Sequence, residues 1–427
     1  MSLLHFLPRA DDFSRTKSAL FKDLIAGVTV AIVALPLALG FGITSDVSAK
    51  AGLTTAIIAG FIAALFGGSR FQVSGPTGAM TVVLIPVVHK FGIIALPILG
   101  LMAAVLVILM ALLKFGPIIN RVPWAVVEGF TVGIAVIIAL QQLPLALGVA
   151  KGDGEKTLEV AYRTMSDALN HDLALPTIAV VVLTLVTKFG YPHLSRRIGV
   201  KIHIPASFVA LLVASLTVKI FALHTALIGD IPRSVGSWTA PVFANFSMKD
   251  LAIPALWIAL LIAIESLLAA RVADTLAHVP ADQKFDPNKE LFGQGLATAA
   301  ASVFGGMPAT GAIARTSVNV RSHAQSRMAA IFHAIVLLFI ALIAAPLVES
   351  IPSAAIAGVL LGTSYRILNP ASIRESLRTT KAESATLIIT ALSTIAIDLI
   401  WGIAIGIVLH LFLVNGSKRM RNRHGSK

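Results

Sequence analysis

Glu265 and Arg315 are charged residues that lie within apolar stretches of the chain. Glu265 belongs to the segment Trp257–Leu268, in which every other residue except Ser266 is apolar. A charge at the centre of a membrane helix costs about 3 kcal/mol, so it predicts a functional residue. A low dielectric favours the neutral form of a carboxyl group, which would let Glu265 carry a proton together with a solute. A structural ion pair with Arg271 or Arg315 is the alternative interpretation.

Sodium is the second candidate for an ion at Glu265. A carboxylate can bind a hard cation together with hydroxyl and carbonyl oxygens, and Thr310 could supply a hydroxyl. Ala269, one helical turn after Glu265, offers no side-chain oxygen. We therefore expect H+ as the coupling ion, with Na+ as the alternative, and we expect no cofactor and no bound metal centre.

Two similar segments each open an apolar run that is too short to cross a bilayer alone. Ser74–Thr81 reads Ser-Gly-Pro-Thr-Gly-Ala-Met-Thr, and Pro308–Arg315 reads Pro-Ala-Thr-Gly-Ala-Ile-Ala-Arg. Such short runs indicate half-helices, whose free N-terminal amide groups attract anions. A charge one turn into the second half-helix would add to this attraction. We predict an anion site formed by Thr77, Gly78, Ala79, Thr310, Gly311, Ala312 and Arg315.

Close helix packing is the alternative explanation for the small residues of these segments. Arg315 could likewise do no more than neutralise Glu265. Two interrupted backbones within a membrane must nevertheless be buried in protein or line a cavity, because unsatisfied peptide groups are costly in lipid. This requirement favours a binding site.

The composition indicates that membrane helices position these residues. Of the 427 residues, 56% are hydrophobic and only 13% are charged, which is about half the charged fraction of a soluble domain. A helix of about 20 residues crosses a bilayer, and apolar runs of this kind recur along the chain. We predict an all-α polytopic membrane protein with fourteen transmembrane segments, at about residues 24–43, 52–67, 76–89, 94–113, 124–147, 173–189, 203–222, 252–273, 290–304, 311–322, 328–348, 353–366, 383–397 and 399–415.

The charge distribution indicates membrane topology and not nucleic-acid binding. The formal net charge is +13, but the basic residues lie in short loops between the apolar runs. Fourteen spans put both termini on one side, where most Lys and Arg then lie, and the positive-inside rule identifies that side as cytoplasmic. The prediction is a multi-pass protein of the cell (inner) membrane, with a cytoplasmic segment 1–23, a transporter domain 24–415, a basic cytoplasmic tail 416–427, a short helix at 158–169 outside and an interfacial helix at 369–381.

The half-helices are the third and the tenth predicted spans, so a seven-span unit would occur twice with opposite orientations. A 7+7 inverted repeat with interrupted helices at matching positions is typical of secondary transporters. The site should therefore lie where residues 75–80 and 309–315 meet.

Several motifs make the chain resemble the sulfate permease (SulP) family of anion transporters, which includes prestin and pendrin. In order, the motifs are Ala34–Phe41, Ala51–Leu53, Phe66–Gly68, Ser74–Gly78, Asn288–Leu291, Gly293–Gly295, Phe304–Gly311 and Arg315–Asn319, and the resemblance covers nearly all of residues 20–415. It implies that Phe41 walls the anion pocket, that Arg315 binds the anion and that the carboxylate at Glu265 lies beside the substrate.

The resemblance also implies a division into two moving parts. A core domain of spans 1–4 and 8–11 (about 24–113 and 252–348) would move as an elevator against a gate domain of spans 5–7 and 12–14 (about 124–222 and 353–415). Family members usually continue into a cytoplasmic regulatory domain of the anti-sigma-factor-antagonist (STAS) type, whereas this sequence ends at Lys427. Many members are dimers, so a homodimer is a further expectation.

The expected function is secondary active transport of a small anion, namely bicarbonate, sulfate or a dicarboxylate such as fumarate, by proton-coupled symport. Sodium-coupled symport, anion exchange and an anion channel are alternatives. A nucleobase symporter of the same fold is a further alternative, but residues 309–319 contain Arg315 and no acid that would bind a ring. An enzyme is not expected, because Gly75–Gly78 lacks the Gly-Lys-Ser/Thr ending of a phosphate loop and no catalytic or zinc spacing occurs.

Overall fold

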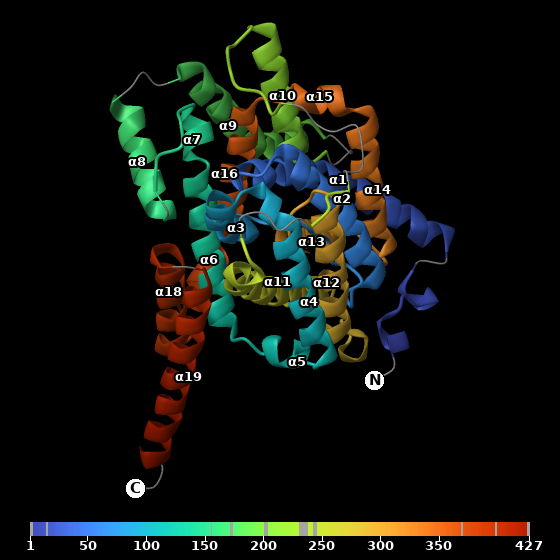
Figure 1. Cartoon of the computed structure of the whole chain (residues 1–427), viewed down its shortest axis with the longest axis vertical. Coiled ribbons are helices and arrows are strands. Elements are labelled where there is room, and N and C mark those ends of the chain that lie inside the picture. Colours follow the sequence, from blue (N-terminus) through green and yellow to red (C-terminus); the bar gives the residue numbers. More distant parts are fainter. Residues whose placement is uncertain are drawn as a thin grey trace.

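Helices account for nearly all elements of the computed structural model (Figure 1). The structure describes residues 3–13, 16–154, 156–170, 174–199, 204–229, 238–241, 246–368, 370–397 and 399–424. Among these residues, six helices are long and apolar enough to cross a membrane by themselves, and four more apolar helices are shorter. The predicted all-α membrane fold is confirmed.

Each of the fourteen predicted spans corresponds to a helix or to a pair of helices. The first repeat contains α1 (Lys17–Thr44), α2 (Ala49–Phe66), α3 (Gly78–Phe91), α4 (Leu96–Leu112), α6 (Trp124–Gln141) with α7 (Leu143–Leu147), α9 (Leu175–Ile198) and α10 (Ala206–Ile220). The second repeat contains α11 (Met248–Leu276), α12 (Pro287–Val303), α13 (Ile313–Arg321), α14 (Met328–Ile343) with α15 (Ala345–Glu349), α16 (Ser353–Leu368), α18 (Lys381–Ala396) and α19 (Leu399–His424).

Several predicted boundaries differ from the structure. Helix α1 begins at Lys17, inside the predicted cytoplasmic segment 1–23. The fifth span is broken between α6 and α7, where Pro144 lacks the amide hydrogen that would continue the helix. Helix α9 extends past the predicted end at residue 189 and stops only at Gly199, which adopts a left-handed conformation with φ 72°. Helix α19 likewise continues through much of the predicted tail, of which residues 425–427 lie outside the described residues. Loss of hydropathy marks the end of an apolar run, whereas a helix ends where its backbone hydrogen bonds end.

Short helices occupy the loops between spans. They are α5 (Gly116–Ile119), α8 (Thr157–Asn170) and α17 (Pro370–Ser376). Helix α8 confirms the short helix predicted at 158–169. Helix α17 covers part of the predicted segment 369–381, whose first residue, Asn369, lies outside the described part of the chain.

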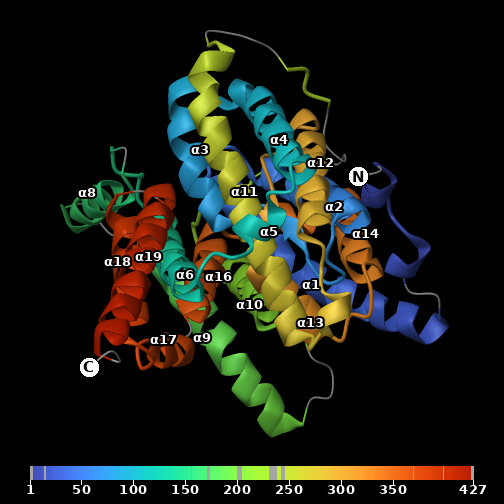
Figure 2. The same ribbon diagram turned by 90° about the horizontal axis from the view of Figure 1, so that it is seen from below.

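The helices form two groups that lie side by side (Figure 2). Helices α1–α4 and α11–α14 pack on one another, and helices α6, α9, α10, α16, α18 and α19 form the second group. Contacts of α1 with α16 and of α3 with α6 join the groups. Close packing within the first group depends on glycine: a Cβ atom at Gly52 of α2 would overlap the carbonyl oxygen of Ala38 in α1.

The N-terminal segment lies against the starts of α12 and α14. It contains the 3-10 helices η1 (Leu3–Phe6) and η2 (Ala10–Asp12). The Phe6 side chain is 2% exposed, and its ring stacks on Phe292 with 4.6 Å between the centroids. The segment is therefore anchored to α12 by an aromatic contact.

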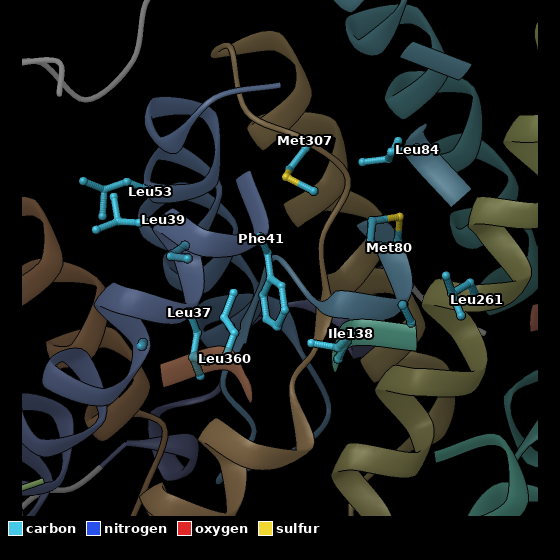
Figure 3. Packing of buried hydrophobic residues seen from close by; sticks show 14 of the residues in the cluster. Leu37, Leu39, Phe41, Leu53, Met80, Leu84, Ile138, Leu261, Met307 and Leu360 are labelled. Carbon is cyan, nitrogen blue, oxygen red and sulfur yellow. The ribbon is translucent and has the colours of Figure 1, made fainter. Parts of the chain in front are cut away.

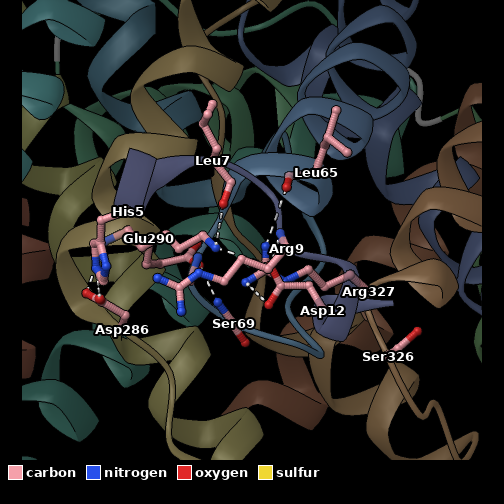
Figure 4. Close-up of polar contacts among 12 residues, drawn as sticks. His5, Leu7, Arg9, Asp12, Leu65, Ser69, Asp286, Glu290, Ser326 and Arg327 are labelled. Carbon is pink, nitrogen blue, oxygen red and sulfur yellow. Dashed lines mark hydrogen bonds and ion pairs between the residues drawn. The ribbon is translucent and has the colours of Figure 1, made fainter. Parts of the chain in front are cut away.

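Asp12 provides the ionic anchor of this segment (Figure 4). Its carboxylate lies 3.1 Å from Lys289 Nζ and 3.3 Å from an Arg327 guanidinium nitrogen. Burial raises the pKa of Asp12, but a backbone hydrogen bond and the charges of Arg327 and Lys289 outweigh this effect and hold the pKa below its ordinary value. The ionised form of Asp12 thus stabilises the folded chain.

Candidate functional site

The two half-helices begin where two segments of the chain, 74–75 and 310–311, cross and pair, and this region is called the crossing. Strand β1 (Ser74–Gly75) pairs antiparallel with β2 (Thr310–Gly311), with Ser74 opposite Gly311 and Gly75 opposite Thr310. Helix α3 starts three residues after β1, and α13 starts two residues after β2. The amide groups at both helix N-termini, which have no partner within their own helix, therefore converge on the same region.

Thr77 and Ala312 are the residues that immediately precede α3 and α13. The Thr77 hydroxyl accepts a hydrogen bond of 3.4 Å from the Met80 amide, as helix-capping threonines do. The Ala312 amide donates to the Val73 carbonyl at 2.9 Å, which joins the two segments just beyond the strand pair. The sequence-predicted residues from Thr77 to Ala79 and from Thr310 to Ala312 are thus brought together.

Glu265 reaches both segments from α11. Its Oε2 atom accepts a 2.9 Å hydrogen bond from the Thr77 hydroxyl and a 2.5 Å hydrogen bond from the Thr310 hydroxyl. The next residue, Ser266, accepts a hydrogen bond from the Gly311 amide at 3.0 Å. Glu265 is 8% exposed, so one buried carboxyl group links the starts of both half-helices.

The Thr77 and Thr310 hydroxyl oxygens also lie 3.3 Å from each other. These two oxygens and the Glu265 carboxyl group are the ligand types that a hard cation requires. Within the described residues, no cluster of three or more His, Asp or Glu side chains suited to a metal ion occurs. Thr77, Thr310 and Glu265 thus place two hydroxyl oxygens and one carboxyl group at a single point, where the sequence predicts the coupling ion.

Arg315 supplies the positive charge of the crossing. Its side chain is 1% exposed, lies over Gly75 and donates a short hydrogen bond from Nη2 to the Pro76 carbonyl. Its Nη1 atom has no hydrogen-bond partner among the described residues. A buried guanidinium with an unused donor is suited to bind an anion.

The ion pairs considered for Glu265 are absent from the described part of the chain. Glu265 is satisfied by hydroxyl groups, and no salt bridge joins it to Arg315 or to Arg271. Arg271 instead donates to the Val122 carbonyl at 3.4 Å. Among the described residues, Glu265 therefore forms no direct ion pair, although the charge of Arg315 acts on it from beyond salt-bridge distance.

Phe41 forms an apolar wall beside the start of α3 (Figure 3). It is 7% exposed, and a Cβ atom at Gly78 would lie 3.2 Å from its ring and would overlap Ile138 of α6. A larger residue at position 78 would therefore require the Ile138 side chain to move. The ring of Phe41 thus lies beside the first residue of α3, and its role as a wall of the anion pocket stays a prediction.

Gln72 and His333 are buried polar residues near the crossing to which the sequence motifs assign no role in the site. The amide of Gln72 lies over Gly311, and neither its oxygen nor its nitrogen has a partner among the residues described. Both ring nitrogens of His333 in α14 also lack one. Two features of the sequence could have indicated these residues. Gln72 lies two residues before β1, and His333 is a polar residue within the apolar sequence of α14.

Comparisons with known proteins show the family of the chain. The model of the "Sulfate permease family" matches residues 20–390. The chain is 37% identical to YvdB of Bacillus subtilis (strain 168) over 91% of this chain and 72% of YvdB. It is 32% identical to "Bicarbonate transporter BicA" of Picosynechococcus sp. (strain ATCC 27264 / PCC 7002 / PR-6) over 95% of this chain and 71% of that protein.

Two solved structures share the fold. The transmembrane domain of a cyanobacterial bicarbonate transporter BicA superposes with a TM-score of 0.78 at 28% identity, covering 93% of this chain and 98% of that one. The murine anion transporter Slc26a9 in the inward-facing state gives a TM-score of 0.83 at 16% identity, covering 97% and 72% of the two chains. Because the family model spans most of the sequence and the fold matches, the chain belongs to the sulfate permease family of membrane anion transporters and is not an enzyme.

Proposed function

We propose that the protein is a secondary active transporter that binds one small anion between the N-termini of α3 and α13. The observation that carries this proposal is the convergence of two half-helix N-termini on the buried Arg315 guanidinium, which keeps one donor unused. An anion there would accept hydrogen bonds from backbone amides and from Arg315, while Phe41 excludes water on one side. The group α1–α4 with α11–α14 would carry the anion as an elevator along the second group of helices.

The charge of the site limits the substrates. Each half-helix N-terminus contributes about half a positive charge, and Arg315 adds a full one, so the site carries about +2 when Glu265 is neutral and about +1 when it is ionised. Bicarbonate and sulfate are the first candidates, since the relatives are named for them, and fumarate is the third. A divalent anion should therefore require a protonated Glu265 more strongly than a monovalent anion does.

Proton symport through Glu265 is the proposed coupling. The carboxyl group contacts both half-helices, so its protonation and the binding of the anion act on the same backbone segments. Sodium is a second candidate, because the Thr77 and Thr310 hydroxyl groups could turn their lone pairs toward a cation beside the carboxylate. Exchange without a coupling ion and an anion channel are outcomes of the test below.

The proposal includes the cell (inner) membrane as the location, with both termini cytoplasmic, since most Lys and Arg residues lie on that side of the predicted topology. A homodimer remains an expectation from the family. Because the chain contains no cysteine, a single cysteine placed after Lys427 and labelled from one side of the membrane reports the orientation directly.

Uptake into proteoliposomes tests the proposed function. Purified protein would be assayed with labelled bicarbonate, sulfate and fumarate, each with and without sodium, for the wild type, Arg315→Gln and the exposed control Arg163→Gln. We expect saturable uptake of at least one anion, a loss of uptake in Arg315→Gln and wild-type kinetics in Arg163→Gln. Uptake that does not saturate and is accompanied by unitary currents would show a channel. Equal KM values for the wild type and Arg315→Gln would contradict the proposal that Arg315 binds the anion.

A further inference from the structure

Glu290, on the first turn of α12, holds the loop that leads into β1. Its Oε2 atom accepts hydrogen bonds from the backbone amides of Gly68 and Ser69 at 2.8 and 2.9 Å. The side chain is 1% exposed. Figure 4 shows Glu290 and Ser69 beside the ionic contact between Asp12 and Arg327. This carboxyl group therefore binds two backbone amides in the loop that follows the end of α2.

Gln294, one turn further along α12, continues the contact to β1 itself. The two hydrogens of its Nε2 group serve two acceptors, Glu290 Oε1 at 2.8 Å and Ser74 Oγ at 2.6 Å. Ser74 lies opposite Gly311 in the strand pair, and the residue before Gly311 is Thr310, which donates to Glu265. Side-chain hydrogen bonds thus connect Glu290 to Ser74, and the backbone of the strand pair connects Ser74 to Thr310 at the centre of the site.

Helix α12 approaches this loop too closely for other contacts to replace these bonds. A Cβ atom at Gly293 would lie 2.5 Å from the Gly67 amide nitrogen and 2.6 Å from its Cα atom, and a Cβ atom at Gly68 would overlap the Asp286 carbonyl. The loop therefore contacts α12 through backbone atoms and through the Glu290 carboxyl group. Removing that group leaves the Gly68 and Ser69 amides and one Gln294 hydrogen buried without an acceptor, which a shift of the loop would relieve.

We propose that Glu290 is a positioning residue for anion binding. It acts through Gln294 and Ser74 to set the register of β1 against β2, and thereby the spacing of Thr77, Thr310 and Arg315. The inference rests on the proposed function, because it assumes that the anion binds at this crossing. At metal sites, removing the hydrogen-bond partner of a ligand typically lowers affinity by about tenfold or more, and we expect an effect of similar size at this anion site.

Reversing the direction of the hydrogen bonds tests this role. In Glu290→Gln, rotation of the Gln294 amide would let its oxygen accept from the new amide and from the Ser74 hydroxyl, so we expect KM within about threefold of the wild type. In Gln294→Glu, two carboxyl groups face each other across one turn, and KM should rise by on the order of tenfold. In the double variant Glu290→Gln with Gln294→Glu, the amide introduced at position 290 donates to the carboxylate introduced at position 294. That carboxylate also accepts from the Ser74 hydroxyl, so KM should return toward the wild-type value.

The measurements are KM and Vmax for uptake of the transported anion, together with the thermal midpoint of each purified variant. Glu290→Ala should raise KM about tenfold, and the exposed Glu375→Gln serves as the control with unchanged KM. If Glu290→Ala does not fold, the comparison of Gln294→Glu with the double variant still decides. Wild-type KM in Gln294→Glu, or no recovery in the double variant, would overturn the positioning role, whereas absence of uptake by the wild type would overturn the proposed function instead.

Discussion

Replacing Thr310 with valine removes a hydroxyl group from the centre of the site without changing the shape of the side chain. The Thr310 hydroxyl donates at 2.5 Å to Glu265 Oε2, and Thr310 is fully buried. Water cannot readily replace this donor, and a hydrogen bond to a charged group contributes about 2 kcal/mol. If one step of the cycle requires ionised Glu265, Vmax/KM should fall about 30-fold in Thr310→Val. Thr310→Ser keeps the hydroxyl and should stay within about threefold of the wild type.

A double-mutant cycle identifies the partner of this hydroxyl. The assay is initial uptake of the transported anion into proteoliposomes at several concentrations, for Thr310→Val in the wild-type and in the Glu265→Gln backgrounds. If the hydroxyl acts through the carboxylate, Thr310→Val should have little further effect once Glu265 is glutamine. An equal loss in both backgrounds, or a loss in Thr310→Ser as large as in Thr310→Val, would refute the reasoning.

Two further variants probe the backbone of the crossing and the N-terminal anchor. In Gly75→Ala, a Cβ atom on a residue with φ 153° would overlap Arg315 Nη1. KM for the anion should therefore rise at least about tenfold. The control is Gly190→Ala in α9, where the added Cβ atom meets nothing within 4 Å and KM should stay unchanged. In Asp12→Asn, the thermal midpoint at pH 7 should be lower than that of the wild type. The reason is that the pKa of Asp12 is lower in the folded chain than in the unfolded chain, so its ionised form stabilises the fold. This stability is present above the ordinary pKa of Asp12 and is lost as the pH falls through the folded-state pKa. The difference between the two midpoints should therefore persist down to about pH 4, the ordinary pKa of an aspartate, and shrink only as the pH falls further toward the lower folded-state pKa. A difference that stays constant through that more acidic range would show that ionisation of Asp12 is not the cause.

The order of the helices and the region of the site could be predicted because they depend on local patterns. Long apolar runs locate the spans, and the repeated Thr-Gly-Ala segments locate both half-helices, which the structure brings together in the pair β1–β2. The rarity of a carboxylate in an apolar helix singled out Glu265. Each of these signals can be read without knowing which helices are neighbours.

The partners of the charged groups could not be predicted, because they depend on tertiary packing. Two hydroxyl groups, and not a cation, satisfy Glu265 in the described residues, and Arg315 turns to the Pro76 carbonyl. Glu290 stood at the first residue of a predicted span, where a carboxylate has an obvious role at the helix N-terminus. Only the close approach of α12 to Gly67 and Gly68 shows that the Glu290 side chain accepts hydrogen bonds from the loop after α2.

Acidification of the lumen of sodium-free proteoliposomes tests the central claim most directly. A pH-sensitive dye would be trapped inside, and an inward gradient of bicarbonate, sulfate or fumarate would be applied to vesicles with the wild type or with Glu265→Gln. We predict that at least one anion drives proton entry through the wild type and that Glu265→Gln abolishes it. Proton entry of equal rate in both proteins, or anion uptake that moves protons only when sodium is added, would contradict proton coupling at Glu265.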